Sequence, residues 1–308
     1  MKISEFTSPQ SINMPLLVTQ VKAGVTNSGA PYLSINFRDN SGTIEGKMWD
    51  VKEKDNQLIK QGKVLNVKAD VINYRGSLQL KVMDCCEPLT EVDIKDFVMT
   101  GPYSEETLRK YISEEIDKIE NRDIFRIVSD IYRTYDKEIY FSAAAVKNHH
   151  EYIGGLATHV YSMLHLAEMV CVNYPYLNHD LLVGGVLLHD IGKVVELKTG
   201  PVSEYTVEGN LIGHISISQT LIKESADRLN IDSEEVLLLR HMVLAHHGQH
   251  EYGSPVLPMT IEAEALHFID DIDAKMSMIE RELKNIPTKS FTSRIFALDN
   301  RSFYKHDI

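Results

Sequence analysis

The chain has 308 residues and a net charge of −12 at pH 7, and its length suggests two domains. Its 43% hydrophobic and 25% charged residues are typical of globular proteins and exclude a disordered or fibrous one. Its apolar runs are far shorter than the roughly 20 residues of a membrane span, and MKISEFTSPQ lacks the apolar core of a signal peptide, so we expect no membrane partner.

The first ninety residues alternate between apolar and polar side chains, as half-buried β-strands do. In PYLSINFRD, residues 31–39, one face carries Leu33, Ile35 and Phe37. Three further segments repeat the pattern: 42–49, 63–74 and 77–84. Turn residues separate the strands, at 27–31, 39–42 and 75–76. Residues 51–62, between the third and fourth strands, are expected to form one short helix.

Five short strands with a helix between the third and fourth resemble an OB-fold nucleic-acid-binding domain. Such barrels stack bases on aromatic side chains while cationic side chains follow the backbone of the strand. The outward-facing candidates are aromatic or basic: Tyr32, Arg38, Lys47, Trp49, Lys68, Tyr74, Arg75 and Lys81. Alternatively, Trp49 could cover the end of the barrel, Tyr32 could be a turn residue, and the basic residues could form a solvated face.

Helical spacing replaces the alternation after residues 87–100. Ser104 is a predicted N-cap, and apolar residues recur at helical spacing from Leu108 onward. The later predicted helices cover 156–173, 178–189, 211–229, 232–246 and 260–284. We therefore expect a multidomain protein with a small all-β OB barrel followed by an all-α bundle. The expected bounds are 1–90 for the barrel, 91–104 for a linker, 105–285 for the bundle and 286–308 for a C-terminal extension.

Charge and histidine are distributed unevenly between the two parts. Residues 1–90 carry 11 Lys and Arg against 9 Asp and Glu, whereas residues 91–308 carry 21 against 35. All 13 histidines lie between His149 and His306. The second part therefore has the acidic, imidazole-rich composition of a cation site.

The three cysteines cannot form a disulfide framework, so we expect a cytoplasmic protein.

The helical region contains the imidazole and carboxylate side chains that a two-cation phosphoesterase site needs. Neighbouring groups are 24 to 32 residues apart, about one helical hairpin, and lie on or at the end of different predicted helices: His159, His189, Asp190, His214, His246, His247 and Asp270. Such spacing allows them to converge in the core of a bundle. The alternative is a core of polar residues without a cation. That core would leave several buried groups unpaired, at about 1 to 3 kcal/mol each.

The order H…HD…H…HH…D, with HDIGK at 189–193, resembles the HD superfamily of metal-dependent phosphohydrolases over about residues 140–285. The resemblance implies a first ion with four ligands, His159, His189, Asp190 and Asp270. It implies a second ion that shares Asp190 and has three further ligands, His214, His246 and His247. Lys193 is similar to a lysine that lies near the scissile phosphate in several relatives. Asp190 and Lys193 are therefore the predicted catalytic residues.

The remaining histidines and aspartates in this region are expected to have lesser roles. Asp273, one helical turn after Asp270, is expected to support the ligands or to face solvent. Five histidines are expected on the surface or on helix faces: His165, His179, His241, His267 and His306. Three others flank the predicted site and could touch a phosphate: His149, His150 and His250.

An OB domain followed by an HD domain in about 310 residues is similar to the YhaM family of bacterial 3′–5′ exoribonucleases. The segments AHHGQHEYGSP (245–255) and FALDNRSFYK (296–305) extend the resemblance over nearly the whole chain. The resemblance implies removal of nucleoside 5′-monophosphates from the 3′ end of single-stranded RNA, with some action on single-stranded DNA. It implies two divalent metal ions, Mn²⁺ first and Co²⁺, Mg²⁺ or Fe²⁺ as alternatives.

Two other functions are compatible with the same residues. The first is an HD-type phosphohydrolase of nucleotides or cyclic dinucleotides, although HHGQHEYGSP lacks the GYP signature of cyclic di-GMP phosphodiesterases. The second is a non-catalytic nucleic-acid-binding protein with a structural metal site. A homo-oligomer is compatible with the sequence, but no residue requires it.

Overall fold

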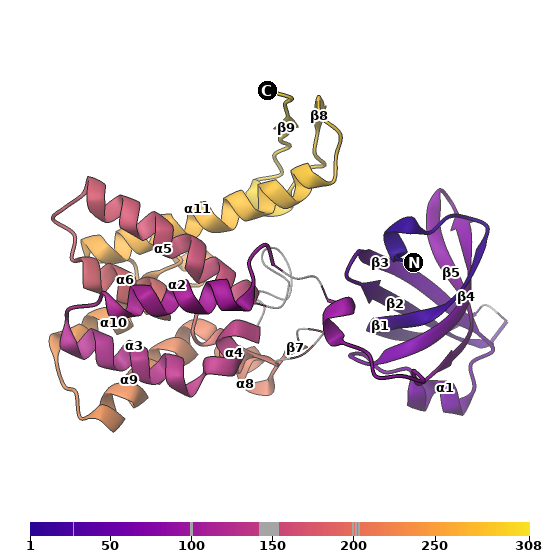
Figure 1. Ribbon diagram of the computed structural model, residues 1–308, viewed down its shortest axis with the longest axis horizontal. Helices are drawn as coiled ribbons and strands as arrows, with labels where there is room; N and C mark the ends of the chain where they lie inside the picture. The colour runs from indigo at the N-terminus through magenta and orange to yellow at the C-terminus, as the bar shows by residue number, and fades with distance from the viewer. Residues whose placement is uncertain (27, 99–100, 142–153, 199, 201, 203) are drawn as a thin grey trace. The chain divides into compact units, whose positions relative to one another are not determined.

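The computed structural model describes residues 1–308 apart from 27, 99–100, 142–153, 199, 201 and 203 (Figure 1). The chain divides into two compact units, residues 1–100 with 200–202 and residues 101–199 with 203–308. The first unit is a closed β-barrel and the second is helical, which confirms the predicted fold class.

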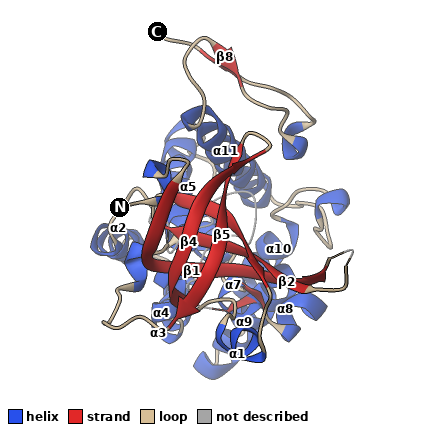
Figure 2. Ribbon diagram, turned by 90° about the vertical axis from the view of Figure 1, so that its right-hand side faces the viewer, coloured by secondary structure: helices blue, strands red, loops and turns tan. Residues whose placement is uncertain are grey.

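Five strands close into a barrel in the order β1-β2-β3-β5-β4 (Figure 2). Their bounds are Gln10–Val25 for β1, Pro31–Asp39 for β2, Gly42–Trp49 for β3, Val64–Tyr74 for β4 and Ser77–Cys86 for β5. A short helix, α1 (Glu53–Leu58), lies between β3 and β4 in the chain and is shorter than the predicted 51–62. Strands β3 and β5 pair in parallel, and the other neighbours pair antiparallel. This is the expected OB layout.

The alternating pattern explains which side of each strand fills the barrel. Leu33, Ile35 and Phe37 of β2 are buried, while the residues between them point outward. The turn after β2 forms because Asp39 Oδ1 accepts hydrogen bonds from the backbone N–H groups of Ser41 and Gly42, at 2.7 and 3.1 Å. The aromatic and basic candidates of β2 and β3 therefore lie on the outer surface of the barrel.

The second unit is a bundle of helices. The longer ones are α2 (Glu105–Asp117), α3 (Arg122–Thr134), α5 (Gly155–Asn173), α6 (His179–Leu188), α9 (His214–Leu229), α10 (Glu234–Ala245) and α11 (Ile261–Lys284). Three short helices complete it: α4 (Asp136–Phe141), α7 (Lys193–Glu196) and α8 (Val207–Ile212). Ser104 caps α2 as predicted, because its side chain accepts a hydrogen bond from the backbone N–H of Thr107.

Helix α6 is the centre of this bundle. All residues from Leu181 to Leu188 are buried, and the helix packs against α3, α5, α10 and α11. A helix that is apolar on every side is stable only inside a core. The end of α6 therefore delivers the next residues, His189 and Asp190, into the interior. Among the described residues, no helix is both long and apolar enough to cross a membrane.

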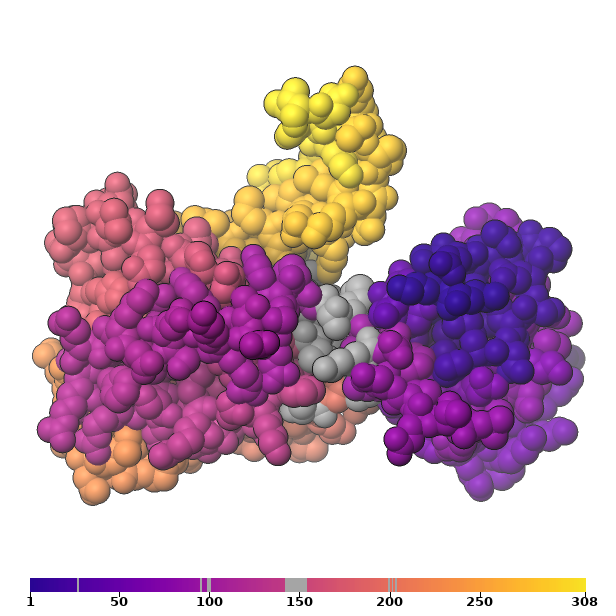
Figure 3. Space-filling model, in the orientation of Figure 1, coloured from indigo at the N-terminus to yellow at the C-terminus, as the bar shows by residue number. Residues whose placement is uncertain are grey.

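Three features differ from the sequence-based expectation. The predicted helix 211–229 is interrupted at Gly213, whose φ of +77° ends α8 and makes His214 the first residue of α9. A two-stranded pair, β6 (Leu197–Lys198) and β7 (Glu204–Tyr205), lies within the helical unit. The last residues form a second pair, β8 (Ser290–Phe291) and β9 (Tyr304–Lys305), beyond α11 (Figure 1). In the space-filling view, this end of the chain is the yellow projection (Figure 3).

Candidate metal centre

The seven predicted ligands come from five places along the helical unit. His159 lies in the second turn of α5, and Asp270 lies in the middle of α11. The other five lie at helix ends: His189 and Asp190 directly after α6, His214 at the start of α9, and His246 and His247 directly after α10. The structure brings their side chains together around Asp190.

A first group of donors surrounds one oxygen of Asp190. The Nε2 atoms of His159 and His189 are 3.2 Å apart. His189 Nε2 lies 3.3 Å from Asp190 Oδ2, and His159 Nε2 lies 3.2 Å from Asp270 Oδ1. Two donors at right angles around one ion, each about 2.1 Å from it, are about 3.0 Å apart. These separations therefore fit a shared divalent ion.

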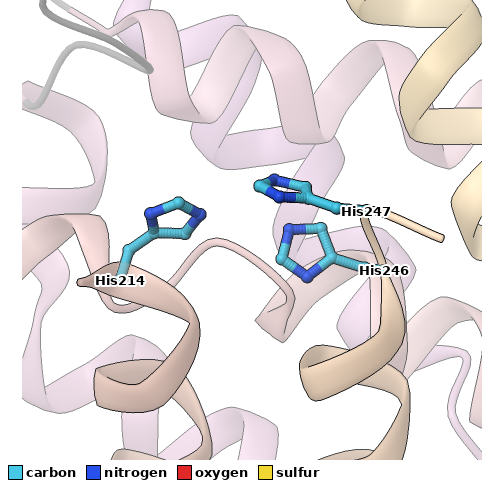
Figure 4. Close-up of side chains that lie close together, drawn as sticks. All are labelled: His214, His246 and His247. Carbon is cyan, nitrogen blue, oxygen red and sulfur yellow. The ribbon is translucent and has the colours of Figure 1, made fainter. Parts of the chain in front are cut away.

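A second group faces the other oxygen of Asp190. One ligand atom from each of His214, His246 and His247 lies within 4.8 Å of those of the other two. Figure 4 shows the three rings facing one another from two different helices. Asp190 Oδ1 lies 3.4 Å from His214 Nε2 and 3.8 Å from His246 Nε2. The Asp190 carboxylate thus points one oxygen at each group, which is the arrangement that a bridging ligand requires.

The five ring orientations are set by hydrogen bonds on the outer side of each ring. Carboxylate and carbonyl oxygens only accept hydrogen bonds, so each Nδ1 must carry a proton and Nε2 is the ring nitrogen that can bind a cation. The acceptors are Asp273 for His159, Val186 O for His189, Glu196 for His214, Val243 O for His246 and Tyr252 O for His247, at 2.6 to 3.1 Å. All five Nε2 atoms are therefore available as cation ligands.

Three of the converging atoms are buried and unpaired. Within the described part of the chain, Asp190 Oδ1, His214 Nε2 and His246 Nε2 have no hydrogen-bond partner. A buried polar atom without a partner costs about 1 to 3 kcal/mol. A cation bound by all three would remove that cost, so the donor set fits a divalent metal ion better than a purely structural role.

The electrostatics of the centre also suit a cation. Burial would raise the pKa of Asp190, but the Lys193 ammonium and the neighbouring His189 ring hold the pKa of this carboxyl well below its usual range. Burial lowers the pKa of His246 and of His247, so both rings are neutral near pH 7. A charged carboxylate beside neutral imidazoles is the form in which these groups bind metals.

His159 differs because two carboxylates act on it. Burial opposes its protonation, but hydrogen bonds with Asp270 and Asp273 outweigh burial and raise the pKa of His159 to about 10. The same contact with His159 holds the pKa of Asp270 far below its usual range, although burial alone would raise it. A divalent ion at this position would take the place of the proton on His159 Nε2.

Lys193 lies beside the bridging carboxylate. The lysine is the first residue of α7, it is buried, and its Nζ donates a hydrogen bond to Asp190 Oδ2 at 2.5 Å. This places a positive charge at the centre. The predicted contact of Lys193 with a scissile phosphate stays a prediction.

Two further carboxylates lie at the centre: Asp273, which was expected either to support the ligands or to face solvent, and Glu196, which the sequence did not single out. Asp273 and Glu196 are buried and accept hydrogen bonds from His159 and His214. The sequence contains a signal for Asp273, because a residue three positions after Asp270 lies on a similar face of a helix. It contains none for Glu196, whose position depends on how α7 packs beside α9.

The other histidines that the structure describes lie outside the donor cluster. His165 stacks on Tyr111, and His179 pairs with Glu168. His267 contacts the backbone oxygen of His246 through Nδ1, at 3.1 Å, and so supports the loop after α10. Of the three that could touch a phosphate, His250 bonds to Ser254 O through Nδ1, and His149 and His150 lie outside the described residues. His241 accepts from the backbone N–H of Met259, and His306 is exposed.

On the barrel, aromatic and basic candidates cluster on β2 and β3. Tyr32 lies in β2, not in a turn, and is paired with Trp49 of β3. Their ring centroids are 5.1 Å apart, and Trp49 is 47% exposed. Lys47 Nζ lies 5.4 Å from the Tyr32 ring centroid, and Lys81 of β5 is paired with Lys47. The exposed Lys22 of β1, which sequence patterns did not single out, is paired with a β2 residue on the same surface.

The other barrel candidates lie elsewhere. Arg38 donates a hydrogen bond from Nε to Phe97 O, so its guanidinium is engaged within the unit. Lys68 lies on β4, whose neighbours are β1 and β5. Tyr74 and Arg75 are exposed at the β4–β5 turn, where the Arg75 guanidinium lies 5.3 Å from the Tyr74 ring centroid. The structure therefore brings together Tyr32, Lys47, Trp49 and Lys81 but not the whole predicted set.

Comparisons with known proteins match both units. Residues 156–275 match the HD domain family, and residues 17–86 match a family described as an OB-fold nucleic acid binding domain. A solution structure of the second OB-fold domain of replication protein A from Methanococcus maripaludis aligns with 30% of this chain and 98% of its own. The sequence identity of that pair is 21% and the TM-score is 0.25.

Curated relatives match nearly the whole chain. The 3′-5′ exoribonuclease YhaM of Bacillus pumilus is 46% identical over 300 residues, which cover 96% of this chain and 95% of that protein. The proteins of the same name from Bacillus licheniformis and Bacillus subtilis are 46% and 45% identical, with the same coverage.

Proposed function

This chain belongs to the YhaM family of 3′-5′ exoribonucleases, and we propose that it releases nucleoside 5′-monophosphates from the 3′ end of single-stranded RNA at the centre around Asp190. The family resemblance predicted from the sequence is thereby confirmed. Its HD domain implies dependence on divalent metal ions, and its OB-fold domain implies binding of nucleic acid.

The proposed centre holds two ions, for which Mn²⁺ is the first candidate. His159, His189 and Asp270 would hold the first ion, and three other histidines would hold the second: His214, His246 and His247. Asp190 would bridge them. Divalent ions bound in this way supply charge stabilisation at the phosphoryl oxygens and a water of lowered pKa.

The observation that carries this proposal is that the two oxygens of the Asp190 carboxylate face different donor groups. Its Oδ2 faces the first donor group, and its Oδ1 faces the second group without any hydrogen-bond partner among the described residues. A carboxylate in a purely structural role would satisfy both oxygens with hydrogen bonds. The Nε2 atoms of His214 and His246 face the same Asp190 oxygen and also have no hydrogen-bond partner among the described residues, and a bound cation would pair them too.

Residues of the chain itself would bind and orient the strand. The Lys193 ammonium, next to Asp190, would neutralise charge that develops on the phosphoryl oxygens. On the barrel, Tyr32 and Trp49 would stack bases, while Lys47 and Lys81 would follow the phosphates.

We propose residues 1–90 as the RNA-binding domain, 91–104 as the linker, 105–285 as the hydrolytic domain and 286–308 as an extension.

The test uses 5′-labelled single-stranded RNA, the full-length protein and Mn²⁺. We expect a ladder that shortens from the 3′ end, protection of RNA with a blocked 3′ end, and no products from Asp190→Ala, which should still bind RNA. Hydrolysis of free nucleotides but not of RNA would favour the nucleotide phosphohydrolase. No product with Mn²⁺, Mg²⁺, Co²⁺ or Fe²⁺ would favour the non-catalytic RNA-binding protein.

Parallel experiments address the finer proposals. Replacing the RNA with single-stranded DNA tests whether DNA is a second substrate, and comparing the four metals tests the preference for Mn²⁺. Sedimentation of the purified protein tests whether it forms a homo-oligomer. The cytoplasmic location expected from the three cysteines stays a prediction.

A further inference from the structure

Of the five imidazoles at the centre, two donate a hydrogen bond from Nδ1 to a carboxylate, and three donate one to a backbone carbonyl. His159 donates from Nδ1 to Asp273 at 2.6 Å, and His214 donates from Nδ1 to Glu196 at 3.1 Å. His189, His246 and His247 donate to backbone oxygens. The two rings that donate to a carboxylate belong to different donor groups, so each group contains one of them.

A carboxylate partner changes an imidazole ligand in two ways. It holds the ring in one tautomer and orientation, and its negative charge raises the basicity of the opposite nitrogen. A backbone carbonyl orients the ring but carries no net charge. We propose that Asp273 and Glu196 are positioning residues that separately set the affinity of the first and the second metal ion. This inference rests on the two-ion centre of the proposed function.

The arrangement around His159 supports this role for Asp273. Asp273 lies one helical turn after Asp270 on α11, and the two carboxylates contact opposite nitrogens of the same ring. Asp270 Oδ1 lies 3.2 Å from Nε2, where the ion would bind. Asp273 Oδ2 accepts the hydrogen bond from Nδ1, on the opposite side of the ring. One rigid helix therefore supplies both a ligand to the ion and the group that orients the neighbouring ligand.

Glu196 controls His214 through two contacts. Its Oε1 accepts hydrogen bonds from the backbone N–H of His214 at 2.9 Å and from His214 Nδ1 at 3.1 Å. The preceding residue, Gly213, provides no side-chain cap for α9. Glu196 thus pairs the first backbone N–H of α9, as a capping side chain does, and orients the first side chain of that helix.

The two effects should be separable. Asp273 lies on α11 and contacts His159, whereas Glu196 lies on α7 and contacts His214. Weakening one contact should therefore lower the affinity of one ion without moving the ligands of the other. A merely structural role would instead lower the stability of the bundle and affect both ions together.

The test measures Mn²⁺ binding to metal-stripped, full-length protein by the electron paramagnetic resonance signal of free Mn²⁺. The variants Asp273→Asn and Glu196→Gln keep the size of the side chain and remove its charge. We expect wild type to bind two ions, and each variant to bind one with unchanged affinity and the other 10 to 100-fold more weakly. Asp271→Asn and Glu204→Gln, which remove charges paired with lysines at the surface, are the matched controls and should bind as wild type.

The same substitutions in a protein that lacks one metal ligand show which ion each carboxylate affects. In His189→Ala, which removes a ligand of the first group, Glu196→Gln should weaken the ion that is left and Asp273→Asn should not. Melting curves without metal show whether each variant folds, and Asp273→Glu, which retains the charge, should recover part of the affinity. Two ions bound as in wild type by both amide variants would overturn this inference and leave the proposed function intact. A wild-type protein that binds no Mn²⁺ would overturn both.

Discussion

Gly192 of the HDIGK motif offers a sharp test of how the fold positions the second donor group. Its backbone N–H donates to Ser218 Oγ at 2.7 Å, so the motif lies against the first turns of α9. A Cβ at this position would lie 2.2 Å from the backbone oxygen of His214, whereas Cβ atoms essentially never approach closer than 3.0 Å. In Gly192→Ala, the motif or the start of α9 must therefore move by about 0.8 Å.

This displacement is large compared with what a metal site tolerates. Ligand distances need to be kept within about 0.2 Å, and a misplacement of about 1 Å can lower a catalytic rate by about 100-fold. Because His214 is the first residue of α9, we expect Gly192→Ala to weaken the second ion and to lower kcat on RNA by about 100-fold. The strain should also cost about 1 to 3 kcal/mol of the free energy of unfolding.

The assay compares Gly192→Ala with Gly184→Ala at saturating Mn²⁺. A Cβ on Gly184 would lie 2.8 Å from Ile124 Cγ2 and 3.2 Å from Leu239 Cδ2, in the core of the bundle and not at the ligands. We expect Gly184→Ala to lower stability without a comparable loss of kcat. Wild-type activity and Mn²⁺ binding in Gly192→Ala would show that this glycine does not position the second donor group, and so would equal losses of kcat in both variants.

Three further measurements test other parts of the structure. Burial would raise the pKa of Asp130, but hydrogen bonds from Ser225 and Arg228 hold it below its usual value. Stability from this group is present above the unfolded pKa of about 3.9 and is lost as the pH falls through the lowered folded pKa. Asp130→Asn should therefore cost about 1.5 to 3 kcal/mol at pH 7, and urea unfolding should show the difference closing below about pH 4. Trp49→Ala should weaken single-stranded RNA binding by about 1 to 3 kcal/mol, read by fluorescence anisotropy in EDTA, and unchanged affinity would count against the proposed stacking with Tyr32. Removal of divalent ions should lower the Tm, since each ion at 100 times its Kd adds about 2.7 kcal/mol, and an identical melt with Mn²⁺ and with EDTA would contradict the proposed centre.

Periodicity in the sequence predicted most of the elements, because burial imposes period two on strands and 3.6 on helices. Leu33, Ile35 and Phe37 are buried as the alternation indicates, and Ser104 caps α2. The break at Gly213 was missed because a glycine within an apolar helical pattern is compatible with a continuous helix. The pairs β6–β7 and β8–β9 were missed because two-residue strands have no period.

The residue types, their order and the HDIGK motif predict an HD-type site. The packing of the helices shows what this pattern leaves open: Asp190 faces one donor group with each oxygen, and each Nδ1 is hydrogen-bonded on the outer side of its ring. It also brought in Glu196, which no spacing rule places beside His214. The physical reason is that the direction of a ligand atom depends on the hydrogen bond behind the ring. The partner in that bond is brought there by the packing of helices that the local pattern does not specify.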